Sequence, residues 1–290
     1  MVTVVAEALN LPIRLVDKVW GCDCLPAPFV TPVDADGAPR RVGEIWFEPP
    51  ALLPDLLIKY IFTSEKLSVQ VHPSDAQTLA MGIGRQGKEE CWLVVDAQPG
   101  ATLGIGFDRS ISTDEMRAAA LDGRIEDMLV WHKVAPGDFF YIPANTVHAI
   151  GAGVSVIEVQ QTSDITYRLY DYGRPRELHL DEGLAVALGQ AYDLSRWHQR
   201  LNESGTVALV DGPHFRLDRV DGVPDAALMN RYGTGAVSVI PLKGDVALNA
   251  AGEARVIHPG ECGVASHVEA IGFAEGGLCL IAQSLTKHAI

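Results

Sequence analysis

The sequence has little positive charge and no long apolar run, and both shortages exclude classes of protein. It contains 23 Lys and Arg residues against 37 Asp and Glu, which gives a formal net charge of −14 at pH 7. Binding to nucleic acid or to an anionic membrane surface needs a basic face, so neither partner is expected. A small anionic substrate remains compatible, because a local cluster of Lys and Arg can override the global charge. The apolar runs are too short to span a bilayer.

Cysteine is scarce and is not spaced for the usual redox or metal motifs. Of the five cysteines, Cys22 and Cys24 form a C-x-C, which is tighter than the C-x-x-C spacing of such sites. We therefore expect reduced thiols with structural roles. The N-terminal segment MVTVVAEALNLPIRLV lacks the basic start of a signal peptide and is interrupted by polar residues. Together these features predict a cytoplasmic protein.

Short apolar segments separated by turns are abundant. The chain has 28 Gly and 17 Pro, and turn signals such as DADG, QPG and APGD separate many of the segments. Many short strands with turns between them favour a sandwich or barrel of β-strands. The predicted strands are LLIKYIF, KLSVQVHP, ECWLVV, DFFYIP, GVSVIEVQQ and AVSVIPLKG.

Two stretches of the chain look alike and suggest two related β-barrel modules. Residues 130–161 and 236–283 each carry a Pro-Gly-acidic turn before an apolar strand. We therefore predict one domain over 1–190, which binds a metal, and a second, degenerate β domain over 191–290 without one. A helical insertion is expected at about 110–130, where STDEMRAAALDGRIEDML starts with cap-like residues and has apolar residues at helical spacing.

Polar residues recur on one face of the predicted strands. Alternate residues of a strand share a face, so Ser68, Gln70 and His72 of KLSVQVHP point the same way while two valines point the other. Glu90 lies in the predicted strand GKEECWLVV, where alternate residues likewise share one face, and His148 follows a Pro-bearing turn. An amide, two imidazoles and a carboxylate form a nitrogen and oxygen set suited to a divalent metal such as zinc. Each residue alone is more often a core or surface residue than a ligand.

Two charged residues lie in segments that otherwise look buried. Lys59 interrupts the apolar strand LLIKYIF, where a lysine normally has a partner or a ligand. The alternative is a side chain that extends to the surface. Glu158 and Gln160 share one face of GVSVIEVQQ, and a solvated face is the alternative there.

At these residues the sequence resembles the type I phosphomannose isomerases. The similar segments are LLIKYIFTSEKLSVQVHPSD, GKEECWLVV, PGDFFYIPANTVHAI and EVQQTSDITYRLYDYGRPRELHLDE, and their order matches as well. The resemblance covers roughly residues 15–185. It implies an all-β-dominated cupin fold, a bicupin of jelly-roll barrels with short helical insertions. It also implies one zinc ion per chain, with other divalent metals open, and interconversion of mannose 6-phosphate and fructose 6-phosphate.

The resemblance also implies a role for each matching residue. The family's metal ligands fall on Gln70, His72, Glu90 and His148, the same four residues as the strand parity indicates. Its active-site glutamate, arginine, lysines and serine fall on Glu158, Arg168, Lys59, Lys88 and Ser68.

Isomerisation of an aldose to a ketose needs a base, a cation and a clamp for the phosphate, because a cis-enediolate carries charge on oxygen. Glu158 is the first candidate for the base, with a pKa raised by enclosure, and Lys88 is its rival. Arg168 would stabilise the enediolate, while a surface ion pair with a nearby aspartate is its alternative. Lys59 and Ser68 would lie at the anion-binding or ring-hydroxyl end.

Other functions stay open at this point. One is isomerisation of another phosphorylated or free aldose, and another is a sugar-phosphate-binding cupin without turnover. An iron dioxygenase is a third, although such sites are usually richer in histidine. The expected partner is a small-molecule sugar phosphate, and the composition is compatible with a monomer or a homodimer.

Overall fold

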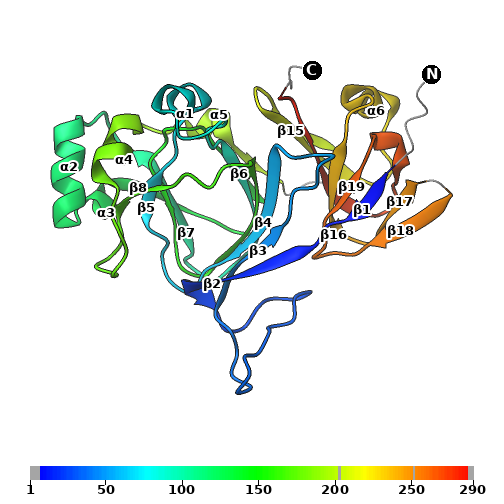
Figure 1. The fold of residues 1–290 in the computed structure, drawn as a ribbon, viewed down its shortest axis with the longest axis horizontal. Coiled ribbons are helices and arrows are strands. Elements are labelled where there is room, and N and C mark those ends of the chain that lie inside the picture. Colours follow the sequence, from blue (N-terminus) through cyan, green and yellow to red (C-terminus); the bar gives the residue numbers. More distant parts are fainter. Residues whose placement is uncertain (1–6, 202–203, 251, 287–290) are drawn as a thin grey trace.

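A computed structural model describes residues 7–201, 204–250 and 252–286 (Figure 1). Residues 1–6, which begin the segment considered above as a signal peptide, lie outside this part. Strands dominate the described chain, and every pairing between its named strands is antiparallel. The strand-dominated fold predicted from the sequence is confirmed.

The left half of Figure 1 contains two sheets that pack against each other around a shared interior. The larger is a seven-stranded sheet, in the order β13 (His198–Arg200), β9 (Asp138–Ile142), β6 (Glu90–Ala97), β11 (Val154–Gln161), β4 (Leu56–Phe62), β3 (Val42–Phe47) and β2 (Ile13–Cys22). The smaller is a five-stranded sheet, in the order β12 (Tyr167–Tyr170), β5 (Val69–Val71), β10 (His148–Ile150), β7 (Thr102–Phe107) and β8 (Leu129–Lys133).

Both faces of the seven-stranded sheet are covered, which explains why every residue of β4 is buried. Ile58 and Tyr60 face the C-terminal half of the molecule and pack with apolar residues such as Leu280. Ile61 faces the interior between the two sheets. Lys59 has the same parity as Ile61, so it is directed into this interior.

Helices cover the outer side of the five-stranded sheet, at the far left of Figure 1. α2 (Thr113–Asp122) begins after Ser112, whose hydroxyl accepts a hydrogen bond from the amide of Glu115, and it is followed by α3 (Ile125–Met128). Both lie within the stretch expected to form a helical insertion. α4 (Leu180–Val186) packs on the same side. Along the chain, α1 (Asp75–Met81) connects β5 to β6, and α5 (Leu194–Trp197) directly precedes β13.

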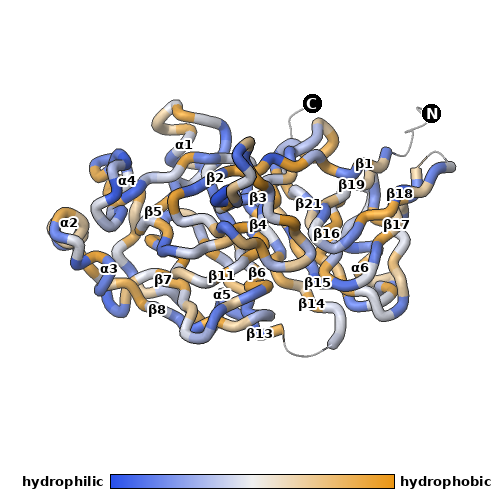
Figure 2. The backbone as a smooth tube through the Cα atoms, turned by 90° about the horizontal axis from the view of Figure 1, so that it is seen from below, coloured by the Kyte–Doolittle hydropathy of each residue, from blue (hydrophilic) through white to orange (hydrophobic). Residues whose placement is uncertain are grey.

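The C-terminal half contains two further sheets around a second apolar core (Figure 2). The six-stranded sheet runs in the order β1 (Ala8–Asn10), β19 (Gly263–Ala265), β16 (Val237–Lys243), β21 (Leu278–Ser284), β15 (Phe215–Asp221) and β14 (Val207–Asp211). The three-stranded sheet consists of β18 (Glu253–Ile257), β17 (Val246–Ala250) and β20 (Ile271–Gly272). α6 (Ala226–Tyr232) and the 3₁₀ helix Val268–Ala270 complete this half.

The two halves exchange short strands. β1 comes from the start of the chain but pairs with β19 in the C-terminal sheet. β13 lies after residue 190 but pairs with β9 in the N-terminal sheet. We keep the division into 1–190 and 191–290 as a proposal, with β1 and β13 as strands that cross between the two parts.

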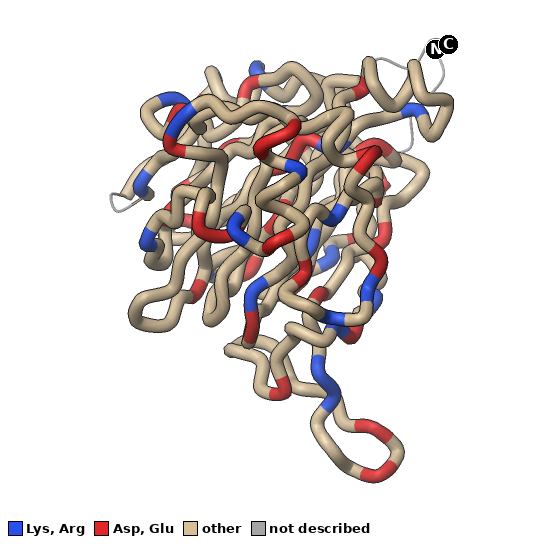
Figure 3. Tube along the Cα trace, turned by 90° about the vertical axis from the view of Figure 1, so that its left-hand side faces the viewer, with Lys and Arg blue, Asp and Glu red and all other residues tan. Residues whose placement is uncertain are grey.

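Within the described residues, no helix is both long enough and apolar enough to cross a membrane. Acidic and basic positions are interspersed along the chain trace on the side of the molecule shown in Figure 3.

Candidate metal centre and active site

Three strands bring the four predicted metal ligands together between the seven-stranded and five-stranded sheets, which form the N-terminal barrel. His148 begins β10 and is the register partner of Gln70 on β5, and His72 follows directly after β5. Glu90 begins β6 of the facing sheet. His72, Glu90 and His148 each offer a ligand atom within 4.8 Å of the others, and each side chain is almost completely buried.

Hydrogen bonds fix both imidazoles in the tautomer that a metal site requires. The Nδ1 atoms of His72 and His148 lie 2.9 Å from the backbone carbonyl oxygens of Ile165 and Thr146. A carbonyl oxygen only accepts, so each Nδ1 carries the proton and each Nε2 keeps its lone pair. These Nε2 atoms lie 3.6 Å and 3.4 Å from the carboxylate oxygens of Glu90.

Burial keeps both imidazoles neutral. Burial and then the Lys88 ammonium lower the pKa of His72 well below its usual value, and the same two causes lower the pKa of His148 to about 4. Neutral imidazole is the form that binds a metal. Burial and the Glu158 carboxylate raise the pKa of Glu90 to about 7, although Lys88 opposes them.

The donor set fits a divalent cation. Glu90 Oε1 is buried and has no hydrogen-bond partner among the described residues, which is costly for a carboxylate unless a cation binds it. The amide of Gln70 lies 3.3 Å from His148 Nε2, and a half-turn about its last bond presents oxygen at the same place. The Lys88 ammonium contacts both Glu90 and His72 Nε2, so these atoms already face a positive charge.

Glu158 lies beside this group, between two buried lysines. It occupies the central strand β11 and is the register partner of Lys59 on β4 and of Trp92 on β6. Lys59 Nζ donates to Glu158 Oε1 at 2.9 Å, Trp92 Nε1 donates to Oε2 at 2.9 Å, and Lys88 Nζ lies 3.9 Å away. The alternatives of a surface-reaching Lys59 and a solvated face at Glu158 are therefore wrong.

The expected raised pKa of Glu158 is also wrong. Burial raises it, but the Lys59 and Lys88 ammonium groups outweigh burial and lower the pKa of Glu158 to about 2. For Lys88, burial acts to lower the pKa, while the Glu158 and Glu90 carboxylates outweigh it and raise the value. At neutral pH the structure therefore favours ionised Glu158 beside protonated Lys88.

A polar cavity of about 410 Å³ opens above these residues. Gln70 and Lys88 line it, while His72, Glu90 and His148 lie behind them and are not part of its surface. Every other residue predicted for catalysis or substrate binding lines the cavity: Lys59, Ser68, Glu158 and Arg168.

Arg168 supplies a positive charge to this cavity that the described carboxylates leave unpaired. It lies on β12 as the register partner of Gln70, and its Nε donates to the carbonyl oxygen of Glu177 at 2.9 Å. The alternative, an ion pair with Asp164 or Asp171, is not found among the described contacts, and Asp171 pairs with Arg174 and Arg176.

Sequence reasoning missed a further charged group in the lining of this cavity. Lys18 Nζ lies 3.3 Å from Glu44 Oε1, and Glu44 Oε2 accepts the indole N–H of Trp46 at 2.5 Å. Trp46 is the register partner of Lys59, whose ammonium lies 4.6 Å from the centre of its ring. The motif GEIW was visible in the sequence, but only the strand register shows that it reaches the cavity.

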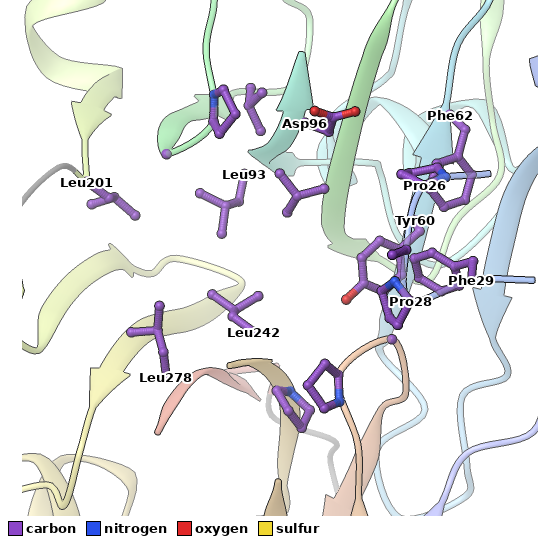
Figure 4. A pocket seen from close by; sticks show the side chains of 18 of the residues that line it. Pro26, Pro28, Phe29, Tyr60, Phe62, Leu93, Asp96, Leu201, Leu242 and Leu278 are labelled. Carbon is purple, nitrogen blue, oxygen red and sulfur yellow. The ribbon is translucent and has the colours of Figure 1, made fainter. Parts of the chain in front are cut away.

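Another cavity, of about 320 Å³, lies between the two halves of the molecule (Figure 4). Proline, aromatic and leucine side chains dominate its lining, including Phe29, Tyr60, Leu93 and Leu242, with Asp96 at its edge. This lining offers few polar groups, whereas the cavity next to Glu158 is lined mainly by polar and charged side chains.

Comparisons with known proteins concern the chain as a whole. No family model matches the chain. Mannose-6-phosphate isomerase ManA of Bacillus subtilis is 35% identical over 199 residues, which is 65% of this chain and 62% of that protein. The chain spans between half and two thirds of the length of the curated relatives it matches.

Solved structures share the fold over nearly the whole chain. The crystal structure of mannose 6-phosphate isomerase from Bacillus subtilis superimposes with a TM-score of 0.75 and 22% identity, covering 95% of this chain and 99% of that one. A zinc-bound mannose 6-phosphate isomerase has a TM-score of 0.68 and 13% identity, covering 96% of this chain and all of that one. The predicted resemblance to phosphomannose isomerases and the predicted cupin-type fold are confirmed.

Proposed function

We propose that the protein is a metal-dependent isomerase that interconverts mannose 6-phosphate and fructose 6-phosphate. One observation carries the proposal: a buried His, Glu, His and Gln set lies directly behind a cavity that also contains Glu158 and Arg168. The similarity to ManA supports the same reaction.

We propose zinc as the metal, one ion per chain, held by Gln70, His72, Glu90 and His148. Two neutral imidazoles with a carboxylate suit zinc, and the amide oxygen completes a set of four. Bound there, zinc would supply Lewis-acid stabilisation of negative charge on the substrate oxygens.

Glu158 is the proposed base for the proton that moves between C2 and C1 of the open-chain sugar. It is ionised at neutral pH, whereas Lys88 keeps its proton and is better suited to donate to a substrate oxygen. The proton leaves C2 for the carboxylate and a cis-enediolate forms; the carboxylate then returns this proton to C1. A second proton moves from O2 to O1, and Lys88 would donate to O1 and regain a proton from O2.

Lys59 links substrate binding to the strength of this base. Its ammonium holds Glu158 at 2.9 Å and keeps the pKa of that carboxyl low, which makes Glu158 a weak base. An anionic substrate that attracts Lys59 would weaken the ion pair and raise the pKa toward the working range. Ser68 would bind a ring hydroxyl, and Arg168 would stabilise charge on the enediolate oxygens.

A coupled assay tests the proposal. Mannose 6-phosphate is supplied and fructose 6-phosphate is detected, with protein as purified, stripped with chelator and reloaded with zinc. We expect activity to disappear with chelator and to return with zinc, and to fall by orders of magnitude, roughly 10³-fold or more, in Glu158→Gln. Arg168→Ala should lose activity as well, and Arg109→Ala, a surface residue paired with Glu115, is the matched control.

The other outcomes separate the alternatives. Turnover of a different aldose would replace the substrate but keep the chemistry. Binding of mannose 6-phosphate without turnover in zinc-loaded protein would favour a binding protein. We further infer a cytoplasmic location and a monomer or homodimer, which fractionation and light scattering test.

A further inference from the structure

The backbone of residues 87–89 leads into the site. Hydrogen bonds on the side away from the cavity hold this backbone in place. Asp75, at the start of α1, accepts the amide of Gly87 at 2.7 Å, and the amide of Lys88 donates to the carbonyl oxygen of Pro73 at 2.9 Å. A Cβ at Gly87 would lie 2.3 Å from that same carbonyl oxygen, so the two segments are in direct contact. This backbone therefore has little space in which to shift.

Glu89 is held on the side of the sheet away from the cavity. Its amide donates to Gln161 Oε1 at 3.0 Å, and its carboxylate accepts the hydroxyl of Tyr141. Gln161 in turn donates to Asp75 Oδ1 at 2.9 Å. Asp75 and Glu89 thus belong to one network that surrounds the segment from which Lys88 and Glu90 enter the site.

One residue from the C-terminal half joins the two carboxylates of this network. His214 lies between β14 and β15, and its Nδ1 is 3.3 Å from Asp75 Oδ2 while its Nε2 is 3.6 Å from Glu89 Oε1. Its side chain is 20% exposed, so solvent only partly screens the two contacts.

We propose that His214 is a positioning residue for the metal centre, a role that rests on the proposed metal site. By bridging Asp75 and Glu89 it fixes the segment that carries Lys88 and Glu90. This assigns the C-terminal half a part in catalysis: it supports the strand that supplies a proposed metal ligand, although none of its described residues lines the polar cavity.

The physical reason is that metal ligands tolerate little displacement. A ligand set works within about 0.5 Å of its productive geometry, and partners behind the ligands commonly change metal affinity by about 10- to 100-fold. Glu90 directly follows Glu89, so a shift in the held backbone moves the ligand carboxylate itself.

The test compares His214→Ala with a control on the same half of the molecule. His258→Ala is the control, since that side chain is 58% exposed and pairs only with the surface residue Asp245 in the described contacts. Each protein is stripped of metal, and its dissociation constant for Zn²⁺ is measured by competition with a chromogenic chelator. The melting temperature and the kcat and KM for mannose 6-phosphate are measured beside it.

We expect His214→Ala to raise the zinc dissociation constant roughly tenfold or more, and to lower kcat with KM changed by less than about twofold. His214→Gln, which keeps side-chain N–H donors, should recover part of the zinc affinity. His258→Ala should match the wild type in all measurements.

Unchanged zinc affinity and kcat with a lower melting temperature would overturn the proposal, because His214 would then only join the two halves. If His214→Ala does not fold, Glu89→Gln is measured instead, as it weakens the same bridge with almost no change in volume. Wild-type zinc affinity in that variant also overturns it.

The zinc measurement needs no turnover, so it separates this proposal from the proposed reaction. A wild type that binds zinc but does not isomerise mannose 6-phosphate refutes the reaction and leaves the role of His214 to be decided by the affinities. A wild type that binds no zinc refutes both.

Discussion

Replacing Lys59 by methionine tests the ion pair at the centre of the site. Lys59→Met keeps the length and the apolar stem of the side chain but removes the ammonium that lies 2.9 Å from Glu158 Oε1. The two side chains are only 8% and 4% exposed, and breaking such a pair by removing one partner costs about 3–5 kcal/mol. Against burial, Lys59 and Lys88 together lower the pKa of this carboxyl group from 4.5 to about 2, so Lys59 supplies only part of the corresponding stabilisation.

The sign of the pH dependence follows from the lowered pKa of Glu158. Because the folded state binds the proton more weakly than the unfolded state, the stabilisation is complete above the unfolded pKa of 4.5. It is lost as the pH falls through the folded pKa of about 2. Wild type and Lys59→Met should therefore differ most at pH 6–7, and the difference should shrink below about pH 4.5.

Urea unfolding at pH 7, 5 and 3.5, followed by fluorescence and circular dichroism at equal zinc content, measures this difference. The control is Lys66→Met, which breaks the more exposed pair with Glu126 and should cost less than about 1 kcal/mol. A loss below about 1 kcal/mol in Lys59→Met, or an equal loss at pH 7 and pH 3.5, would refute the reasoning.

Three further predictions concern the same barrel. Trp92→Phe removes the indole N–H that donates to Glu158 but keeps a ring in the same buried place, so we expect kcat to fall roughly tenfold with little change in KM; an unchanged kcat in the coupled assay would contradict this. His72→Asn removes one of the proposed imidazole ligands, and zinc content after dialysis, measured by atomic absorption, should fall well below one ion per chain. Gly87→Ala places a Cβ 2.3 Å from the carbonyl oxygen of Pro73, so we expect a loss of about 1–3 kcal/mol in urea unfolding, and wild-type stability would show that the backbone yields.

Strand parity alone could group one part of the site, because three of its residues lie within a single short segment. Ser68, Gln70 and His72 follow one another at every second position, and this spacing alone places them on one face. Lys59 was visible for another reason: one cation in a fully apolar strand of seven residues indicates a partner. The structure supplies that partner as Glu158.

The sequence could not predict the contacts that depend on register between distant strands. Glu158 meets Lys59 and Trp92 because β11 lies between β4 and β6, and nothing in the local sequence fixes that order. For the same reason its pKa was expected to rise: burial was foreseen, but the two lysines beside it were not. His214 had no local signal at all, since its role depends on how the two halves pack.

Under the proposed function, the buried charges of the site also explain why the metal and the substrate would each increase the binding affinity of the other. Lys59 and Lys88 balance Glu90 and Glu158, so these four residues add no net charge to the site when all of them are ionised. A divalent cation adds two positive charges there, and burial makes such an excess costly unless an anion compensates it. A sugar phosphate brings nearly the same charge of opposite sign, with Arg168 at the cavity wall to receive it. Linkage is reciprocal, so each ligand should then bind more tightly when the other is present.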